Sequence, residues 1–335
     1  MITGMDALLT KRIFAIFDGK TTGQSLPAQC RDLLESQKNS WPNLAMGYAA
    51  LGSVRTKELR CNGFSVRIHH NPGRIKSTTA RIDQKSIDAR PCFLCLENLP
   101  EPQLGILYRA DFMVLCNPYP ICPEHYTIVH VNHLPQSFAG CTPIFLSMAK
   151  DFSPDFNVFY NGPEGGASAP DHLHFQATNR GILPIEKEIA ERDRMTTVGS
   201  IDGVPLFRER GLGREVMIIE GKDCNALGSA LTKVISAMKS ALSSPAEPRM
   251  NLLASYNGNM WQVAIFPRQR HRPSVYFLPG DDRILISPGM VEMGGVVVTP
   301  LDKDFNRVDA ELVRNIYGEV SVDEETEQRI LAAIT

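Results

Sequence analysis

The run Tyr160-Asn161-Gly162-Pro163-Glu164-Gly165-Gly166-Ala167-Ser168-Ala169-Pro170-Asp171-His172-Leu173-His174-Phe175-Gln176-Ala177 decides how the rest of the chain is interpreted. Its last six residues alternate polar and apolar side chains, so a strand would place His172, His174 and Gln176 on one face. The glycines before them favour a loop whose backbone N–H groups can hold an anion such as a phosphate. The run therefore predicts a nucleophile or metal ligand beside an anion-binding loop, although such histidine pairs alone are more often a solvated face.

Length and charge bound the function classes. With 335 residues and 43% hydrophobic residues, the chain can form one large domain or two ordinary ones, each with a real core. Its formal net charge is -2 and its pI about 6.5, so no overall positive field favours nucleic acid or an anionic membrane surface. Any phosphate is therefore expected to be held by local groups.

Location and redox state follow from the same reading. No apolar run approaches the roughly 20 residues of a bilayer span, and residues 1–20 lack a signal-peptide pattern, so we expect a cytoplasmic protein without a membrane partner. Eight cysteines are too few for a disulfide scaffold. In a reducing compartment, a CxxC pair indicates metal or redox chemistry.

The periodicity predicts an α+β fold with antiparallel hairpins. Short strands are expected at 112–116, 157–160 and 284–286, and helices at 142–152 and from a capping box at Ser321 to Ile334. Past residue 200 the strand and helix patterns start again. We therefore expect two similar halves, residues 1–200 with a helical N-terminal segment and the motif, and residues 201–335.

Two further motifs carry chemistry. Cys92 and Cys95 form a CxxC pair that can turn onto one tetrahedral metal, and because no second pair exists, histidines elsewhere must complete the site. Without a metal they are simply buried thiols. After a predicted strand, the turn Asn71-Pro72-Gly73 leads to Arg74 and Lys76, which are either surface charges or contacts to a phosphate or nucleobase.

Taken together, the His-x-His-x-Gln run, its loop and the CxxC pair resemble the histidine-triad superfamily. The similarity is closest to the branch of galactose-1-phosphate uridylyltransferase, diadenosine tetraphosphate phosphorylase and GDP-L-galactose phosphorylase, over about residues 45–320. The run 172–177 looks most like the last of these, and residues 261–268 look like the second-half strand of that branch. Asp171 departs from the pattern of the first two, so their sugar-phosphate specificity is not carried over.

The resemblance implies a mechanism. In that branch the second motif histidine, here His174, attacks the α-phosphorus of a nucleotide and forms a covalent nucleotidyl-histidine. Gln176 stands where hydrolytic members carry a third histidine; an amide can hydrogen-bond a phosphoryl oxygen but cannot deliver a proton, which favours transfer over hydrolysis. Ser168, with Asn161, Gly165, Gly166 and Ala167, matches the phosphate-holding loop.

The resemblance also implies a structural zinc. His172 matches a ligand that joins Cys92 and Cys95 with one upstream histidine. The spacing leaves two candidates for the fourth ligand, of which His133 is favoured over His130. Four protein ligands leave no open position for substrate, so such a zinc would hold the motif in place.

The sequence thus predicts a nucleotidyltransferase or phosphorylase acting on a nucleoside diphosphate sugar or dinucleoside polyphosphate. Its acceptor would be phosphate or a sugar phosphate. Two rivals remain: a nucleotide hydrolase of the same fold, and a non-enzymatic nucleotide-binding protein stabilised by zinc. The sequence leaves open whether the chain forms a homodimer.

Overall fold

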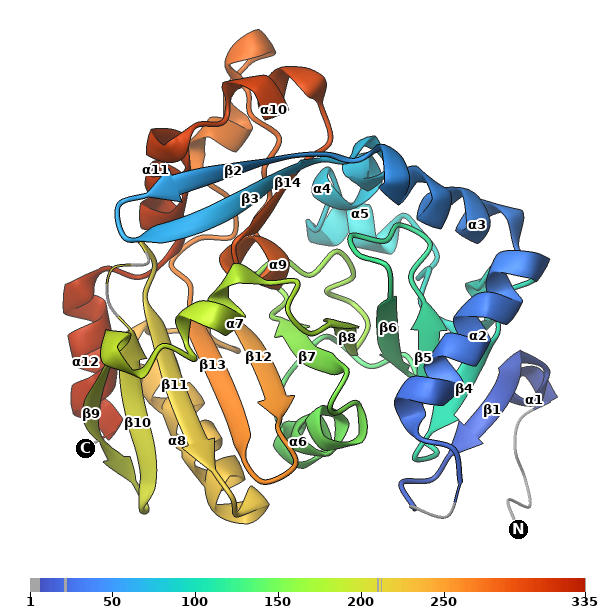
Figure 1. Ribbon diagram of the computed structural model, residues 1–335, viewed down its shortest axis with the longest axis horizontal. Coiled ribbons are helices and arrows are strands. Elements are labelled where there is room, and N and C mark those ends of the chain that lie inside the picture. The colour runs from blue at the N-terminus through green and yellow to red at the C-terminus, as the bar shows by residue number, and fades with distance from the viewer. Residues whose placement is uncertain (1–6, 21–22, 210, 212, 335) are drawn as a thin grey trace.

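The computed structural model describes residues 7–20, 23–209, 211 and 213–334, and one large sheet dominates it (Figure 1). Within these residues the sheet has eleven strands. Their spatial order is β1 (Ile13–Phe17), β4 (Gly105–Tyr108), β5 (Phe112–Cys116), β6 (His125–His130), β8 (His174–Asn179), β7 (Phe156–Asn161), β12 (Met250–Tyr256), β13 (Trp261–Pro267), β11 (Val216–Gly221), β10 (Val204–Glu209) and β9 (Met195–Ile201).

A second, smaller sheet runs across one end of the large one (Figure 1). Its order is β14 (Val296–Thr299), β3 (Phe64–His70) and β2 (Arg55–Cys61). The expected antiparallel hairpins dominate both sheets, but β1 pairs with β4 and β14 with β3 in parallel. These two pairings join segments about 90 and 230 residues apart, so no hairpin pattern in the sequence could signal them.

Twelve helices are assigned within the described residues. They are α1 (Ala7–Arg12), α2 (Leu26–Ser40), α3 (Pro42–Ala49), α4 (Ile75–Thr78), α5 (Gln84–Asp88), α6 (Thr142–Asp151), α7 (Pro184–Glu188), α8 (Cys224–Ala241), α9 (Met290–Met293), α10 (Asp302–Arg307), α11 (Ala310–Val320) and α12 (Glu324–Ile334). None of them combines the length and apolar character of a membrane span.

The longest helix, α8, shows how sequence fixes these elements. The Asp223 side chain accepts hydrogen bonds from the N–H groups of Asn225 and Ala226, at 2.8 and 3.0 Å, and so caps the helix. Apolar residues then recur at helical spacing and are buried, among them Leu227, Leu231, Val234 and Met238. Each such side chain contributes about 1.5–3 kcal/mol on burial, so the packed stripe holds α8 against the sheet.

Alternation along the strands divides the core into two faces. Phe175 of β8 lies in the cluster formed with α2, α6, α8 and α12, where its ring stacks on Phe145 with centroids 5.6 Å apart. The opposite face packs against the small sheet and α9, through residues such as Phe159 and Leu253. Gln176 is paired with Phe159 across β7 and β8, so the polar motif residues face the small sheet.

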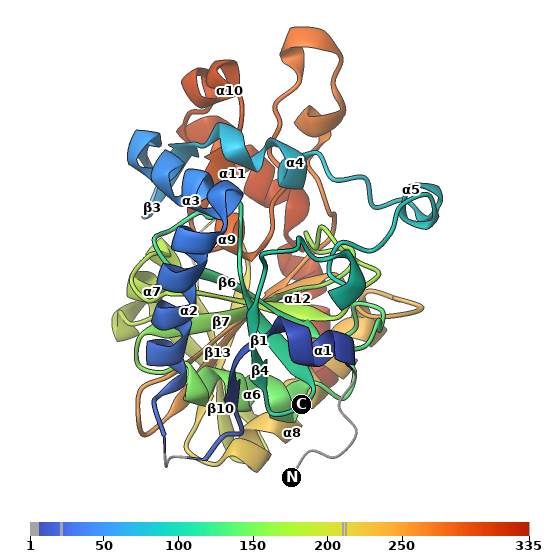
Figure 2. The same cartoon turned by 90° about the vertical axis from the view of Figure 1, so that its right-hand side faces the viewer.

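The strands of the two predicted halves meet where β7 pairs with β12. In Figure 1, β1 lies at one end of the large sheet and β9 at the other, and Figure 2 views the molecule from the β1 end. The predicted boundary at residue 200 falls within β9, and β14 adds to the small sheet with β2 and β3. The division into residues 1–200 and 201–335 stays a prediction.

The local expectations have mixed outcomes. Strands over 112–116 and 157–160 and the helix over 142–152 are confirmed, within a residue or two at each end. The expected strand over 284–286 does not form: the stretch is irregular, and the Ile286 N–H bonds to the Ile284 carbonyl at 3.0 Å rather than to a neighbouring strand. The last helix is capped by Asp323, which accepts from the Thr326 N–H at 2.8 Å, rather than by Ser321. Aspartate is an equally good cap, and it lies nearer the first helical turn.

Candidate functional site

The motif strand is shorter than the sequence indicated. β8 begins at His174, and His172 lies in the preceding turn, so the two histidines do not share a strand face. The backbone turns at 170–172 because Asp171 is held by an ion pair to Arg90, at 2.8 Å, while the His172 N–H bonds to the Ala169 carbonyl. His172 and His174 therefore point to different neighbourhoods.

His174 has a defined tautomer. Its Nδ1 lies 2.8 Å from the His172 carbonyl oxygen, which can only accept, so Nδ1 carries the hydrogen. Nε2 therefore holds the lone pair. This nitrogen makes no hydrogen bond within the described residues, and the residue is only 4% exposed. Burial lowers the pKa of His174 to about 4, so the imidazole is neutral at pH 7.

Gln136 locks the backbone around His174 and was missed in the sequence. Its Oε1 accepts from the His174 N–H at 2.8 Å, and its Nε2 donates to the carbonyls of His174 and Asn161 at 3.0 and 2.8 Å. This buried amide thus joins the start of β8 to the end of β7. No local pattern around residue 136 indicates this role, because the contact crosses about 25–40 residues of sequence.

Gln176 is oriented by a second histidine, His125 of β6. Its Oε1 lies 2.9 Å from His125 Nε2, which leaves its amide nitrogen without a partner among the described residues. Burial, together with the nearby Arg74 guanidinium, lowers the pKa of His125 to about 3, so that ring is also neutral. The Gln176 N–H groups are therefore available as donors.

The structure brings only one of the two predicted basic residues to this end of the site. Arg74 is close enough to affect His125 and donates to the Tyr119 carbonyl at 2.8 Å. Lys76 is exposed and sits over the Tyr119 ring, 5.7 Å from its centroid. Glu292 of α9 lies near Arg74 as well; burial raises its pKa, while a hydrogen bond from the Gly289 N–H and the Arg74 charge oppose this.

The glycine loop offers fewer free N–H groups than its sequence suggests. The N–H groups of Gly165 and Ala167 both bond to the Gly162 carbonyl, at 2.8 and 3.3 Å. Those of Gly166 and Ser168 make no hydrogen bond within the part of the chain that the structure describes. The loop is a tight turn that leaves these two groups for a ligand.

Asn161 is part of a buried network that crosses from β7 to β12. Its Oδ1 accepts from Asn251 Nδ2 and the Met290 N–H, both at 2.7 Å, and Asn251 Nδ2 also donates to the Gly165 carbonyl at 2.6 Å. Arg268, fully buried, donates to Asn251 Oδ1 at 2.6 Å. Burial lowers the pKa of Arg268 to about 9. The side-chain oxygen of Asn161 is thus used for structure.

Close packing explains both loop glycines. A Cβ at Gly165 would lie 2.4 Å from the Met250 carbonyl oxygen, and one at Gly166 would lie 2.6 Å from the Gly289 Cα. Gly166 also has a φ of 109°, a region that L side chains rarely adopt. The loop can therefore reach β12 and α9 only with glycine at both positions.

The predicted metal ligands converge. The donor atoms of Cys92, Cys95, His133 and His172 all lie within 4.8 Å of one another. Cys92 Sγ is 3.3 Å from His172 Nδ1, and Cys95 Sγ is 3.1 Å from His133 Nδ1. Tetrahedral zinc with ordinary bond lengths places its ligand atoms about 3.3–3.8 Å apart, so this donor set fits such a metal.

The alternative ligand, His130, has another role here. Its Nδ1 accepts from the Asn132 N–H at 3.0 Å, and its carbonyl lies 2.8 Å from His172 Nε2. Since a carbonyl only accepts, His172 carries its hydrogen on Nε2 and turns a lone pair on Nδ1 toward the cysteines. His133 therefore belongs to the cluster, and the backbone of His130 orients His172.

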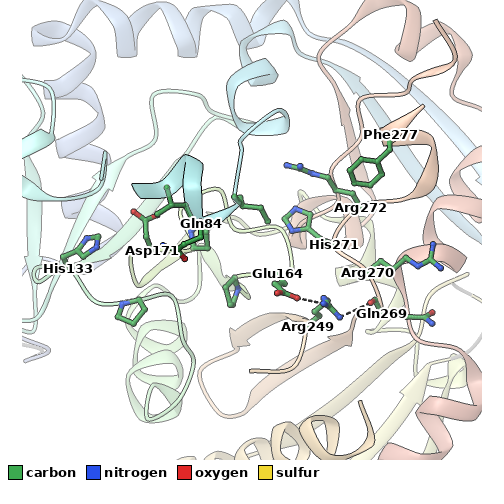
Figure 3. Close-up of a pocket in the computed structure, with 15 residues that line it drawn as sticks. Gln84, His133, Glu164, Asp171, Arg249, Gln269, Arg270, His271, Arg272 and Phe277 are labelled. Atoms are coloured by element: carbon green, nitrogen blue, oxygen red, sulfur yellow. Dashed lines mark hydrogen bonds and ion pairs between the residues drawn. The ribbon is translucent and has the colours of Figure 1, made fainter. Parts of the chain in front are cut away.

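A cavity of about 730 Å³ lies beside the motif turn (Figure 3). One wall includes Pro163, Glu164, Pro170 and Asp171, which flank the glycine loop. The other is formed largely by residues 269–272. Among the predicted site residues only His133 lines this cavity, at the end nearest the cysteine–histidine cluster.

Comparisons with known proteins agree with this architecture. Residues 33–179 match a domain of unknown function (DUF4922), and residues 214–335 match the GDPGP1-like, C-terminal domain. Among solved structures, the chain is similar to yeast Ap4A phosphorylase Apa2, with a TM-score of 0.54 and 15% identity over 84% of this chain and 97% of that one. Its complexes with Ap4A and AMP give TM-scores of 0.52 and 0.51 at 14% identity, each over 84% of this chain, and over 97% and 96% of theirs. No curated protein sequence matches.

These matches confirm the predicted fold. The chain has the α+β fold of the Ap4A phosphorylase, and its residues 214–335 match the GDPGP1-like, C-terminal domain. The roles of individual site residues rest on the geometry above.

The first test concerns the loop. We expect Gly166→Ala to cost about 1–3 kcal/mol through strain at positive φ, with a further cost from the clash with α9. Gly181→Ala also has a positive φ, of 80°, but open space around it, so it isolates the strain. Denaturant unfolding should show the larger loss for Gly166→Ala; equal losses would mean that close packing against α9 does not matter.

Proposed function

We propose that the protein is a nucleotidyltransferase of the phosphorylase type, with His174 as the nucleophile. The observation that carries this is the neutral imidazole of His174, whose Nδ1–H is held by the His172 carbonyl and whose Nε2 lone pair is unpartnered. The fold shared with an Ap4A phosphorylase and the GDPGP1-like match support an enzyme of this class.

The reaction would proceed in two displacements. In the first, the Nε2 lone pair forms a bond to the α-phosphorus of a nucleotide while the bond from that phosphorus to the bridging oxygen breaks, releasing a phosphate-bearing leaving group. The Nδ1–H stays on the ring and strengthens its bond to the His172 carbonyl as the ring gains positive charge. In the second, an oxygen of an acceptor phosphate attacks phosphorus and the P–N bond breaks.

Neighbouring groups would stabilise the charge that develops on the transferred group. The free N–H groups of Gly166 and Ser168, the Ser168 hydroxyl and the Gln176 amide are the donors; such a donor is typically worth about 3 kcal/mol in the transition state. Arg74 would contact the nucleotide within the site. Lys76, which is exposed, would contact only a part of the nucleotide that lies at the protein surface. Asn161, Gly165 and Ala167 would shape the loop rather than bind phosphate directly.

The substrate would be a nucleoside diphosphate sugar or a dinucleoside polyphosphate, and the acceptor inorganic phosphate or a sugar phosphate. The GDPGP1-like match and the Ap4A complex of the structural relative support these two classes. Gln176 favours an acceptor phosphate over water, because an amide cannot act as a general acid as an imidazolium does.

Exposure to GDP-hexose and to Ap4A tests the proposal. Intact-protein mass should reveal a nucleoside monophosphate adduct with one of them, and His174→Ala should lose the adduct and lower turnover by at least about a thousandfold. His70→Ala, at the end of β3 where its ring contacts Arg55 and Phe305, is the matched control. A His174→Ala variant that keeps turnover contradicts the proposal, and ligand binding without any turnover in the wild type favours the binding protein.

Omitting inorganic phosphate separates phosphorolysis from hydrolysis. Turnover should fall at least about tenfold without phosphate, since the adduct then has no acceptor. Equal turnover with and without phosphate would identify the hydrolase.

The pH dependence follows from the pKa of His174. Because the folded pKa is about 4, below the ordinary 6.5, the imidazole stays neutral and the rate of adduct formation should be flat from pH 8 to about pH 5. The same shift means that folding stability falls as pH drops below about 6.5, because the unfolded state then binds more protons. A rate that halves near pH 6.5 in single-turnover measurements, with the fold intact by circular dichroism, would contradict a buried neutral nucleophile.

We further propose that zinc occupies the cluster of Cys92, Cys95, His133 and His172 as a structural metal. When bound, it would supply a four-ligand anchor for the turn that leads into β8, with no open position for substrate.

The protein should contain about one zinc per chain. Cys92→Ser should lose it and lower Tm by roughly 5–10 °C, whereas Cys224→Ser, outside the cluster, should keep it. Elemental analysis showing equal zinc in both variants would contradict this site.

A further inference from the structure

The cavity beside the motif turn has a strongly basic wall. Arg249, Arg270, His271 and Arg272 line it, on the side that Figure 3 shows opposite His133 and Asp171. With about 730 Å³ it is in the size range of pockets for small organic ligands and larger than a single phosphate needs. None of these four side chains takes part in the two displacements proposed above.

The positive charge of this wall exceeds what nearby carboxylates offset. Arg249 pairs with Glu164, and Arg270 has only a long contact to Glu319, at 3.9 Å. Arg272 donates to the Ser287 hydroxyl and the Ala80 carbonyl, at 2.9 and 2.8 Å, and forms no ion pair with a carboxylate among the described residues. Such a wall attracts an anion.

The positive charges of this wall also affect the pKa of His271. Burial, then the charges of Arg272, Arg268 and Arg249, lower its pKa to about 3. Its Nδ1 is buried without a partner among the described residues, so the wall is not satisfied by its own hydrogen bonds.

Arg268 ties this wall to the reaction centre. Its Nη2 donates to the carbonyls of Arg270 and His271, both at 3.1 Å, while its Nη1 reaches Asn251, which holds the Gly165 carbonyl. On the opposite wall, Asp171 is three residues from His174. The basic wall and the glycine loop are thus parts of one rigid network.

We propose that this cavity is the subsite for the phosphate of the leaving group and of the incoming acceptor, with Arg249, Arg270 and Arg272 as its anion-binding groups. The assignment rests on the proposed function, since one subsite must hold the leaving group in the first displacement and the acceptor in the second. Its ligand is a phosphate monoester or polyphosphate. Phe277, 69% exposed at the cavity, offers an apolar surface to the organic part of such a ligand.

Direct binding tests the subsite independently of catalysis. Calorimetric titration of the protein with glucose 1-phosphate and with ATP should show at least one of them binding, and Arg270→Gln and Arg272→Gln should each raise its Kd by about tenfold or more. Arg329→Gln, on α12, is the matched control and should leave the Kd within twofold. The tighter probe distinguishes a sugar phosphate from a nucleoside polyphosphate as the source.

Arg270→Gln is the less disruptive of the two variants, because the Arg270 guanidinium has few contacts within the described residues. Denaturant unfolding that matches the wild type establishes that both variants fold. Binding that is unaffected in both variants, or absent for both probes, overturns the subsite. If the wild-type protein forms no His174 adduct but still binds the probes through these arginines, the proposed function is overturned and the anion site is retained.

Discussion

The hydrogen bond from His174 Nδ1 to the His172 carbonyl is the constraint on which the site depends. It fixes the tautomer, and so leaves the lone pair on Nε2. A backbone carbonyl also fixes the tautomer of His172. The His130 carbonyl accepts from His172 Nε2, so that Nδ1 faces Cys92 and Cys95. Two consecutive backbone carbonyl contacts therefore connect the cysteine–histidine cluster to the nucleophile.

A second constraint is the buried network at the junction of β7 and β12. A fully buried guanidinium is costly unless its donors are paired, and Arg268 satisfies them with Asn251 and with carbonyls, including that of Val320. Because Asn251 also holds Asn161 and Gly165, the position of the glycine loop depends on residues about 90 positions further along the chain. The site is therefore a product of the whole sheet rather than of the motif alone.

The sequence predicted those parts of the site that have a local pattern. Alternation placed His174 and Gln176 on one face, and the CxxC pair with His133 and His172 assembles as the resemblance implied. The motif strand was predicted to begin two residues too early, at His172. The polar–apolar alternation of the sequence extends to residue 172, but there the backbone turns, because Asp171 pairs with Arg90 and His172 faces the cysteines. Gln136, His125, Arg268 and Glu292 escaped prediction since each acts through contacts distant in sequence. The free N–H groups of Gly166 and Ser168 could not be told from those of Gly165 and Ala167 before the turn was known.

The most direct test of this account is the protonation state of the His174 ring, read from ¹⁵N-histidine NMR at pH 7 with the signal assigned by its loss in His174→Gln. We predict a neutral imidazole with hydrogen on Nδ1 and an unprotonated Nε2. An imidazolium, or a neutral ring with hydrogen on Nε2, would contradict the central claim.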